Sequence, residues 1–320
     1  MIKTKYRFIL LICCISLSLI LGISSQSEAV NSEDEFEEVL IHLSHEAEID
    51  SKAPREKVID SLQQAAGNSQ ASLLDFLENK QEKNYVGEIK SYYVANVIYA
   101  ELTPGLFERV EDRSDVEQVY PNEELSFNLP TPQGAVSAHG IDFPWNLEHI
   151  KADEVWNKYD IEGEGVVIGI IDTGVDWEHP ALKKSWRGYE AKEVDYNWFD
   201  PINEASMPND QHGHGSHVAG IAVGHDEDAG IKIGAAPGAQ WIAARGLSDY
   251  GSGYLEDLIA AGEFMLAPTD LEGDNPDPDK APDIIINSWG IENVDGEWYN
   301  EMIENWRKAD ILPVFAAGYR

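Results

Sequence analysis

The chain has 320 residues, of which 43% are apolar and 25% charged, and this composition is typical of a globular protein rather than of a disordered or fibrous one. Asp and Glu number 58 against 23 Lys and Arg, which gives a formal net charge of −35 at pH 7. This charge excludes nucleic-acid backbones and anionic membrane surfaces as partners, because both repel an acidic protein.

The first predicted element is a secretory signal peptide over residues 1–29. An apolar run from Phe8 to Ile23 follows three basic residues and is followed by the small-x-small sequence Ser27-Glu28-Ala29. A membrane anchor is the weaker interpretation, because a spanning helix needs roughly 20 apolar residues. Both cysteines of the chain lie in this segment. The mature secreted product therefore lacks disulfides, thiolate metal sites and cysteine nucleophiles.

Residues 30–137 are predicted to form a small α+β unit that ends in a linker. The predicted elements, in chain order, are a strand at 39–43, a helix at 54–83, a strand at 94–99, a helix at 104–113 and a strand at 116–120. This order is typical of a ferredoxin-like arrangement. Two prolines and a glycine between Asn128 and Gly134 predict an exposed linker.

Residues 138–320 are predicted to form an α/β domain with a doubly wound parallel sheet. The predicted strands, which are near-continuous apolar runs, lie at 166–171, 241–244, 283–286 and 311–315. The predicted helices between them lie at 214–223, 254–266 and 297–308. Strands that are buried on both faces and separated by helices are typical of parallel sheets. The acidic, proline-rich stretch 270–282 is predicted to be a surface loop.

Asp172 directly follows the first of these strands, and in doubly wound sheets the functional side chains stand at the carboxyl ends of the strands. The sequence Asp172-Thr173-Gly174 is also typical of an aspartic protease, in which two carboxylates share a proton. A homodimer could supply the second carboxylate, and that alternative predicts pepstatin-sensitive activity at low pH. The α/β pattern disfavours it, because aspartic proteases have β-rich folds.

A second motif, His214-Gly215-Ser216-His217-Val218-Ala219-Gly220, stands where a loop turns into a helix. A general base must be exposed and oriented, and small neighbours leave room for the backbone of a substrate. The two motifs in this order resemble those of the subtilisin-like serine proteases, the subtilases, in which the second motif reads His-Gly-Thr-His-Val-Ala-Gly. The resemblance implies that Asp172 orients the imidazole of His214 and that His214 is the general base.

His212, His214 and His217 also allow a metal cluster as an alternative. Secreted zinc hydrolases use a different pattern, and a metal would leave Asp172 without a role. We expect His217 to turn into the helix and hydrogen-bond internally, and His212 to be a polar loop residue. No cofactor is expected to be required. Ala181 stands where many subtilases carry a calcium-binding Asp, so that site is not carried over, and the acidic loops allow calcium binding without locating it.

The resemblance also implies a substrate cleft with two extended edges, Gly251-Ser252-Gly253 and Ser288-Trp289-Gly290. Between such edges a peptide adds as a β-strand through main-chain hydrogen bonds. Ordinary turn and strand-end chemistry is the plainer interpretation of both segments. With both catalytic motifs present, we favour the cleft.

The function implied by the resemblance is a secreted, monomeric serine endopeptidase that hydrolyses peptide bonds in proteins and is made as a zymogen. The unit at 30–137 would then be a propeptide that assists folding and occupies the cleft, and signal cleavage would leave no membrane attachment. The peptidase domain at 138–320 is incomplete by comparison with the family.

The family's nucleophile motif, Gly-Thr-Ser-Met-Ala, does not occur in the 320 residues, so no catalytic serine can be assigned. Tyr319 follows Ala316-Ala317-Gly318, where the family carries the Asn of its oxyanion hole. We therefore expect the chain alone to be inactive. The alternative function is that of a truncated, non-catalytic product whose propeptide-like unit binds related proteases and inhibits or folds them.

Overall fold

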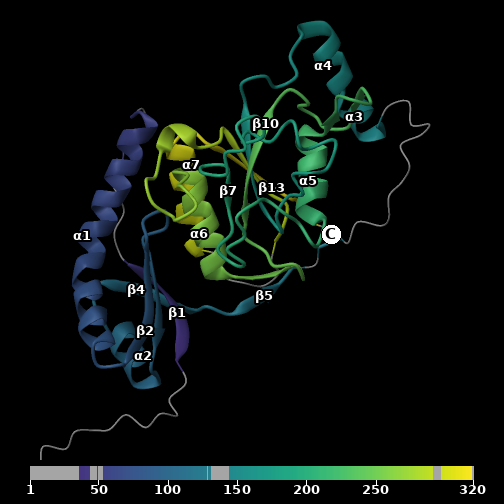
Figure 1. Cartoon of the computed structure of the whole chain (residues 1–320). Helices are drawn as coiled ribbons and strands as arrows, with labels where there is room; N and C mark the ends of the chain where they lie inside the picture. The colour runs from purple at the N-terminus through teal and green to yellow at the C-terminus, as the bar shows by residue number, and fades with distance from the viewer. Residues whose placement is uncertain are drawn as a thin grey trace, which may run out of the picture. The chain divides into compact units, whose positions relative to one another are not determined.

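The computed structural model describes residues 36–43, 49, 53–127, 129–130, 144–290 and 297–318, all of which belong to one compact unit (Figure 1). No helix within these ranges combines the length and apolarity needed to cross a membrane. The predicted signal peptide, Tyr319 and most of the predicted linker lie outside the described residues.

Residues 36–127 contain a four-stranded antiparallel sheet with the strand order β2-β3-β1-β4. Its elements are β1 (Glu37–Leu43), α1 (Arg55–Gln81), β2 (Val86–Tyr92), β3 (Val97–Leu102), α2 (Pro104–Glu111) and β4 (Val116–Pro121). This is the predicted ferredoxin-like order. Val39 and Ile41 of β1 share a core with Leu73 and Leu77 of α1, so the helices cover one face of this sheet.

The predicted strand at 94–99 is wrong in its bounds. Residues 93–96 form the turn between β2 and β3, and β2 itself was not predicted. Val94 and Ala95 are fully buried in this turn, which explains why the apolar run was taken for a strand. Asn96 adopts a positive φ of 47°, and its side chain donates a hydrogen bond to the Leu43 carbonyl. The asparagine thus stabilises the turn.

The following segment contains a five-stranded parallel sheet with the strand order β13-β12-β6-β10-β7. Its strands are β6 (Val167–Asp172), β7 (Trp198–Phe199), β10 (Gln240–Arg245), β12 (Ile284–Asn287) and β13 (Leu312–Phe315). Its main helices are α5 (His214–Val223), α6 (Leu255–Leu266) and α7 (Glu297–Lys308). The predicted doubly wound α/β architecture is confirmed.

The shorter elements escaped prediction. They are β5 (Glu124–Ser126), α3 (Trp145–Ile150), α4 (Ala152–Tyr159), β8 (His225–Asp226), β9 (Ile231–Lys232), β11 (Ser252–Tyr254) and the 3-10 turn Pro278–Lys280 within the predicted acidic loop. The strands among them span two or three residues, too few for an alternating pattern to identify them.

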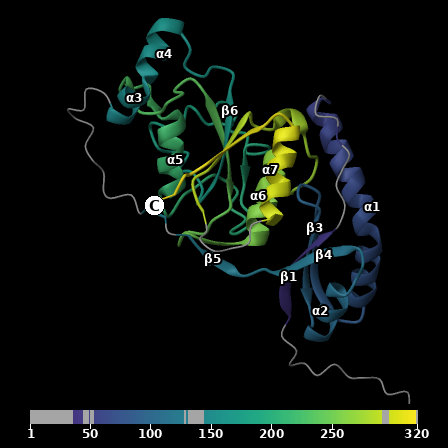
Figure 2. The ribbon, with the colours of Figure 1, turned by 180° about the vertical axis from the view of Figure 1, so that it is seen from behind.

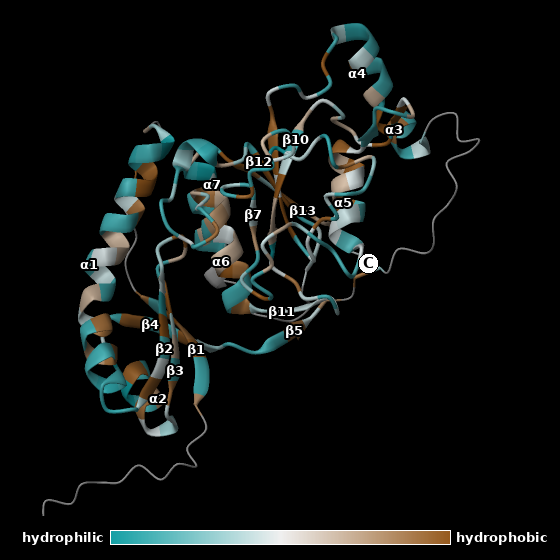
Figure 3. Ribbon diagram, in the orientation of Figure 1, coloured by the Kyte–Doolittle hydropathy of each residue, from teal (hydrophilic) through white to brown (hydrophobic). Residues whose placement is uncertain are grey.

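The parallel sheet is covered on both faces, with α5 on one side and α6 and α7 on the other (Figures 1 and 2). Ile168 and Ile170 of β6 pack with α5, whereas Ile171 packs with α6, as expected from the alternation of side chains along a strand. Apolar colour lies along α5 and α6 in Figure 3. β6 is the central strand, so Asp172 at its end stands in the most enclosed part of the domain.

The two sheets are joined through α6 and α7. Leu40, Val97 and Tyr99 of the first sheet belong to the same apolar cluster as residues of these two helices and of the first turns of α1. Asn305 of α7 donates a hydrogen bond of 2.9 Å to the Val94 carbonyl in the β2–β3 turn. The antiparallel sheet is thus packed against the outer helices of the parallel one.

Candidate active site

Asp172 and His214 lie in direct contact. Asp172 is the last residue of β6 and His214 the first residue of α5, and Asp172 Oδ1 is 2.7 Å from His214 Nδ1. The aspartate is 0% exposed and the histidine 3%. The other ring nitrogen, Nε2, makes no hydrogen bond within the described residues. The pair therefore has the geometry of an oriented general base with one nitrogen free to accept a proton.

Glycines in both motifs allow the two backbones to meet. A Cβ at Gly215 would overlap the Gly174 carbonyl oxygen, and a Cβ at Gly174 would overlap the Asn209 carbonyl oxygen. Gly174 also adopts a positive φ of 104°, which disfavours any residue with a side chain. Gly174 and Gly215 therefore permit the close approach of the backbones around Asp172 and His214.

We expect Gly215→Ala to separate Asp172 from His214, because its methyl group would overlap the Gly174 carbonyl oxygen, which is a backbone atom rather than the end of a flexible side chain. Overpacking of this kind costs about 1–3 kcal/mol. The free energy of unfolding, measured by denaturant titration, should fall by that amount. The matched control is Gly220→Ala in the same helix, where the nearest atom to an added Cβ is an Ile233 methyl at 3.9 Å. An equal loss in both variants would contradict this explanation.

The side chains of Asp210 and Thr173 hydrogen-bond to the backbone on either side of His214, and the sequence motifs did not predict these contacts. The Thr173 hydroxyl donates to Asp210 Oδ1 (2.9 Å) and accepts from the Gly215 amide (3.0 Å). Asp210 also accepts hydrogen bonds from the amides of Gly213 and Ser216, each at 2.8 Å. A carboxylate a few residues before a helix is a known capping signal and could have identified Asp210.

The surroundings of His214 favour its protonated form. Burial lowers the pKa of His214, but the hydrogen bond with Asp172 and the negative charges of Asp172 and Asp210 outweigh burial and raise the pKa above its usual value. A raised pKa makes the imidazole a stronger base.

The other two histidines lie in the elements that were expected. His217 lies in α5, where its amide donates a hydrogen bond of 3.0 Å to the Gly213 carbonyl and its side chain is exposed. His212 is half-buried, with its ring centroid 6.2 Å from that of His214, and its Nδ1 has no partner within the described residues. Among those residues no three His, Cys, Asp or Glu side chains come close enough to hold a metal ion.

The first predicted cleft edge, Gly251 to Gly253, lies largely in β11, and an earlier segment of the chain is paired with it. β5 runs antiparallel to β11, with Leu125 opposite Gly253 and Ser126 opposite Ser252. The Phe127 amide extends the pairing with a hydrogen bond of 3.0 Å to the Gly251 carbonyl. A Cβ at Gly253 would meet the Gly246 carbonyl oxygen at 2.6 Å. This edge therefore binds an extended peptide through its main chain.

The second predicted edge, Ser288-Trp289-Gly290, follows β12 without forming a strand. The Trp289 indole N–H donates to the Ile171 carbonyl (2.9 Å), one residue before Asp172. Its ring lies edge-on to Phe127, with centroids 5.6 Å apart. Both predicted edges thus contact the segment around β5.

Residues 163–320 match the model of the subtilase family, and the parallel-sheet domain of this chain belongs to that family. Bacillopeptidase F of Bacillus subtilis is 40% identical over 277 residues, which are 82% of this chain and 19% of that protein. The serine protease AprX of the same species is 30% identical over 197 residues, 61% of this chain and 38% of that protein.

Solved structures agree on the fold. The epidermin leader peptide processing serine protease of Staphylococcus aureus superposes with a TM-score of 0.56 at 14% identity, covering 89% of this chain and 60% of that one. The present chain spans less than half the length of both curated relatives.

Proposed function

We propose that the chain is the N-terminal part of a secreted serine endopeptidase that is made as a zymogen and hydrolyses peptide bonds in proteins. The observation that carries this proposal is the buried Asp172–His214 pair beside a strand that already holds an extended peptide. Membership of the subtilase family supports a serine-type hydrolase. Secretion is supported by the signal-like sequence at 1–29 and by matches such as the minor extracellular protease Vpr of Bacillus subtilis.

In the proposed reaction His214 Nε2 accepts the hydroxyl proton of a serine as the serine oxygen attacks the peptide carbonyl. Asp172 holds the proton on Nδ1, so that the free nitrogen faces the nucleophile, and stabilises the imidazolium that forms. The imidazolium then donates its proton to the leaving amine. Because only neutral His214 can act as the base, the rate should fall as the pH drops below its raised pKa.

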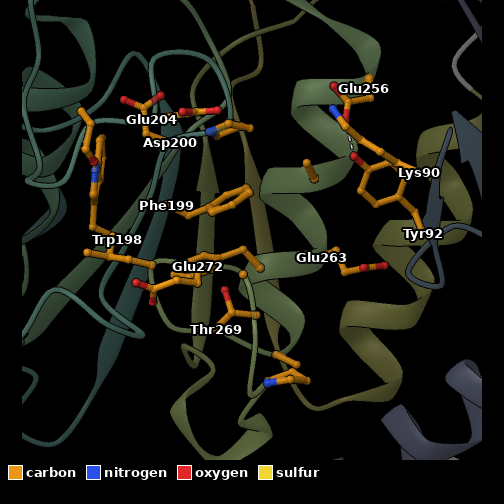
Figure 4. A pocket seen from close by; sticks show the side chains of 18 of the residues that line it. Lys90, Tyr92, Trp198, Phe199, Asp200, Glu204, Glu256, Glu263, Thr269 and Glu272 are labelled. Carbon is orange, nitrogen blue, oxygen red and sulfur yellow. Dashed lines mark hydrogen bonds and ion pairs between the residues drawn. The ribbon is translucent and has the colours of Figure 1, made fainter. Parts of the chain in front are cut away.

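Residues 36–127 would be the inhibitory propeptide of this zymogen. Their C-terminal strand β5 occupies β11 in the manner of a substrate, and their sheet packs on α6 and α7. Polar contacts add to the packing: Glu256 of α6 contacts both the Tyr92 hydroxyl and Lys90 (Figure 4), and Glu263 accepts hydrogen bonds from the Tyr93 and Val94 amides.

The proposed activity can be tested with a chimera in which residues 1–318 continue into the rest of the subtilase domain of bacillopeptidase F. We expect the chimera to hydrolyse casein and to react with a fluorophosphonate probe, while the 320-residue chain does neither. A folded chimera that does not hydrolyse casein would overturn the proposal. The intact mass of the product secreted by the native host tests the zymogen separately, because processing removes the mass of the signal peptide and the propeptide.

A binding module is the second candidate function. It is favoured by the separate core of residues 36–127, in which β1, β3 and both helices share buried apolar side chains. Residues 31–127 expressed alone should slow an active subtilisin, and no inhibition at micromolar concentration would remove this candidate.

A further inference from the structure

Arg245, the last residue of β10, is 0% exposed and uses all of its hydrogen-bond donors. A guanidinium group has five N–H donors in a fixed plane. Nε donates to Asp200 Oδ2 (2.9 Å), and Nη1 donates to the Thr173 carbonyl (2.8 Å) and to Asp249 Oδ1 (2.7 Å). Nη2 donates to the carbonyl (3.0 Å) and to the side-chain oxygen (2.5 Å) of Asn209.

These four partner residues come from three loops at the carboxyl end of the sheet, because Asp200 and Asn209 both lie between β7 and α5. Thr173 follows the catalytic Asp172, and Asn209 precedes Asp210, whose carboxylate holds the turn into His214. Asp249 lies in the loop that leads into β11, and Asp200 follows β7. One side chain therefore connects the residue after Asp172, the loop that precedes His214 and the loop that leads into the peptide-binding strand β11.

Stability alone does not account for a buried arginine. Removing two or more charges from water costs free energy that the ion pairs only partly return, and apolar replacements of buried ion pairs are often neutral or stabilising. The main-chain pairing of β10 with β6 already places Arg245 opposite Asp172, and this pairing does not involve the Arg245 side chain. What the planar guanidinium adds is a fixed geometry among these loops, because its five donors lie in one plane and each is bonded to one of them.

We infer that Arg245 is a positioning residue, which sets the catalytic pair and the peptide-binding strand in one arrangement. This inference rests on the proposed function, because a catalytic pair is positioned only in an enzyme. Its test is independent of that function, because the two quantities measured below are properties of the 320-residue chain and require no hydrolysis. The failure of either proposal can therefore be recognised separately.

The test compares the chain with Arg245→Lys, which keeps the positive charge and loses the planar arrangement of five N–H donors. The pKa of His214 is measured by NMR titration of its ring, and hydrogen exchange is measured at the Phe127 amide, which is bonded to Gly251. In Arg245→Lys we expect the pKa of His214 to fall by about half a unit and the Phe127 amide to exchange about tenfold faster. Exchange at Trp241 to Ala244, within β10, should stay unchanged.

Arg187→Lys is the matched control, because Arg187 also bonds a side chain and two carbonyls, Asn197 Oδ1, Lys280 O and Tyr196 O, with no contact to the catalytic residues. It should leave both readouts at the values of the parent chain. Parent values in a folded Arg245→Lys variant would overturn the inference.

Two milder variants keep the test decisive if Arg245→Lys does not fold. Asp249→Asn weakens only the connection to β11 and should accelerate exchange at Phe127. Asn209→Ala removes the side-chain acceptor of Arg245 Nη2, together with the hydrogen bond that the Asn209 side-chain amide donates to the Met207 carbonyl, and should lower the pKa of His214. Parent values for both variants would likewise overturn the inference.

Discussion

In the chimera, His214→Ala should lower the turnover number by about a millionfold, because loss of the base in a serine-protease triad removes nearly all of its catalytic advantage. Asp172→Asn should lower it by about 10⁴, since the ring would then take the wrong tautomer. Both side chains are buried, and their 2.7 Å contact is the only one that orients the ring through Nδ1 within the described residues. Initial rates on a peptide substrate, with the enzyme concentration set by active-site titration of the parent, give both values.

His217→Ala is the control for this measurement, because His217 lies three residues further along the same helix and is exposed. It should retain the activity of the parent. The His214 variant should also accumulate as an unprocessed precursor, visible in its intact mass. Retention of more than about 1% of activity by His214→Ala would exclude His214 as the general base.

The second large effect concerns Glu263, a half-buried residue whose carboxylate lies against the β2–β3 turn. It accepts hydrogen bonds from the Tyr93 (2.7 Å) and Val94 (3.0 Å) amides, and burial raises its pKa from 4.5 to about 8. When folding raises the pKa of an acid, the folded state holds the proton more tightly than the unfolded state does. The acid therefore stabilises the folded state fully at a pH below its pKa in the unfolded chain, and this contribution is lost as the pH rises to its pKa in the folded protein. The free energy of unfolding should therefore fall between pH 4.5 and 8, by up to about 5 kcal/mol.

Glu263→Gln tests this effect, because a glutamine oxygen can accept the same hydrogen bonds and does not titrate. Denaturant titrations at several pH values should give a smaller pH dependence for the variant, which should be the more stable protein above pH 8. Asp257, whose pKa burial raises to about 6, contributes a separate step at lower pH in both proteins. Glu304→Gln, an exposed position on α7, is the control. The same pH dependence in parent and Glu263→Gln would contradict the assignment.

The contact between Asp172 and His214 was predictable because both residues stand in short local motifs. Asp172 follows an apolar strand, His214 opens a helix, and each is followed by glycine within a short motif. The main helices were predictable for a similar reason, and α5 and α7 have the predicted bounds. Hydrophobic period and motif spacing are both properties of short segments.

The contacts that assemble the site could not be predicted, because each joins segments far apart in the sequence. Nothing near Arg245 indicates that its partners lie in three separate loops, and nothing in β5 indicates that it pairs with β11. The β2–β3 turn misled the prediction for the same reason, since Val94 is buried by helices that come much later in the chain. Tertiary contact overrides local pattern at these positions.

The position of Trp289 also determines how the cleft can be observed. Its indole ring lies against Phe127 and is hydrogen-bonded to the strand that ends in Asp172. The emission of an indole shifts to longer wavelengths when water replaces an apolar neighbour, so departure of the segment around Phe127 would change the fluorescence of this tryptophan. The molecule thus carries an intrinsic optical signal of whether its peptide-binding strand is occupied.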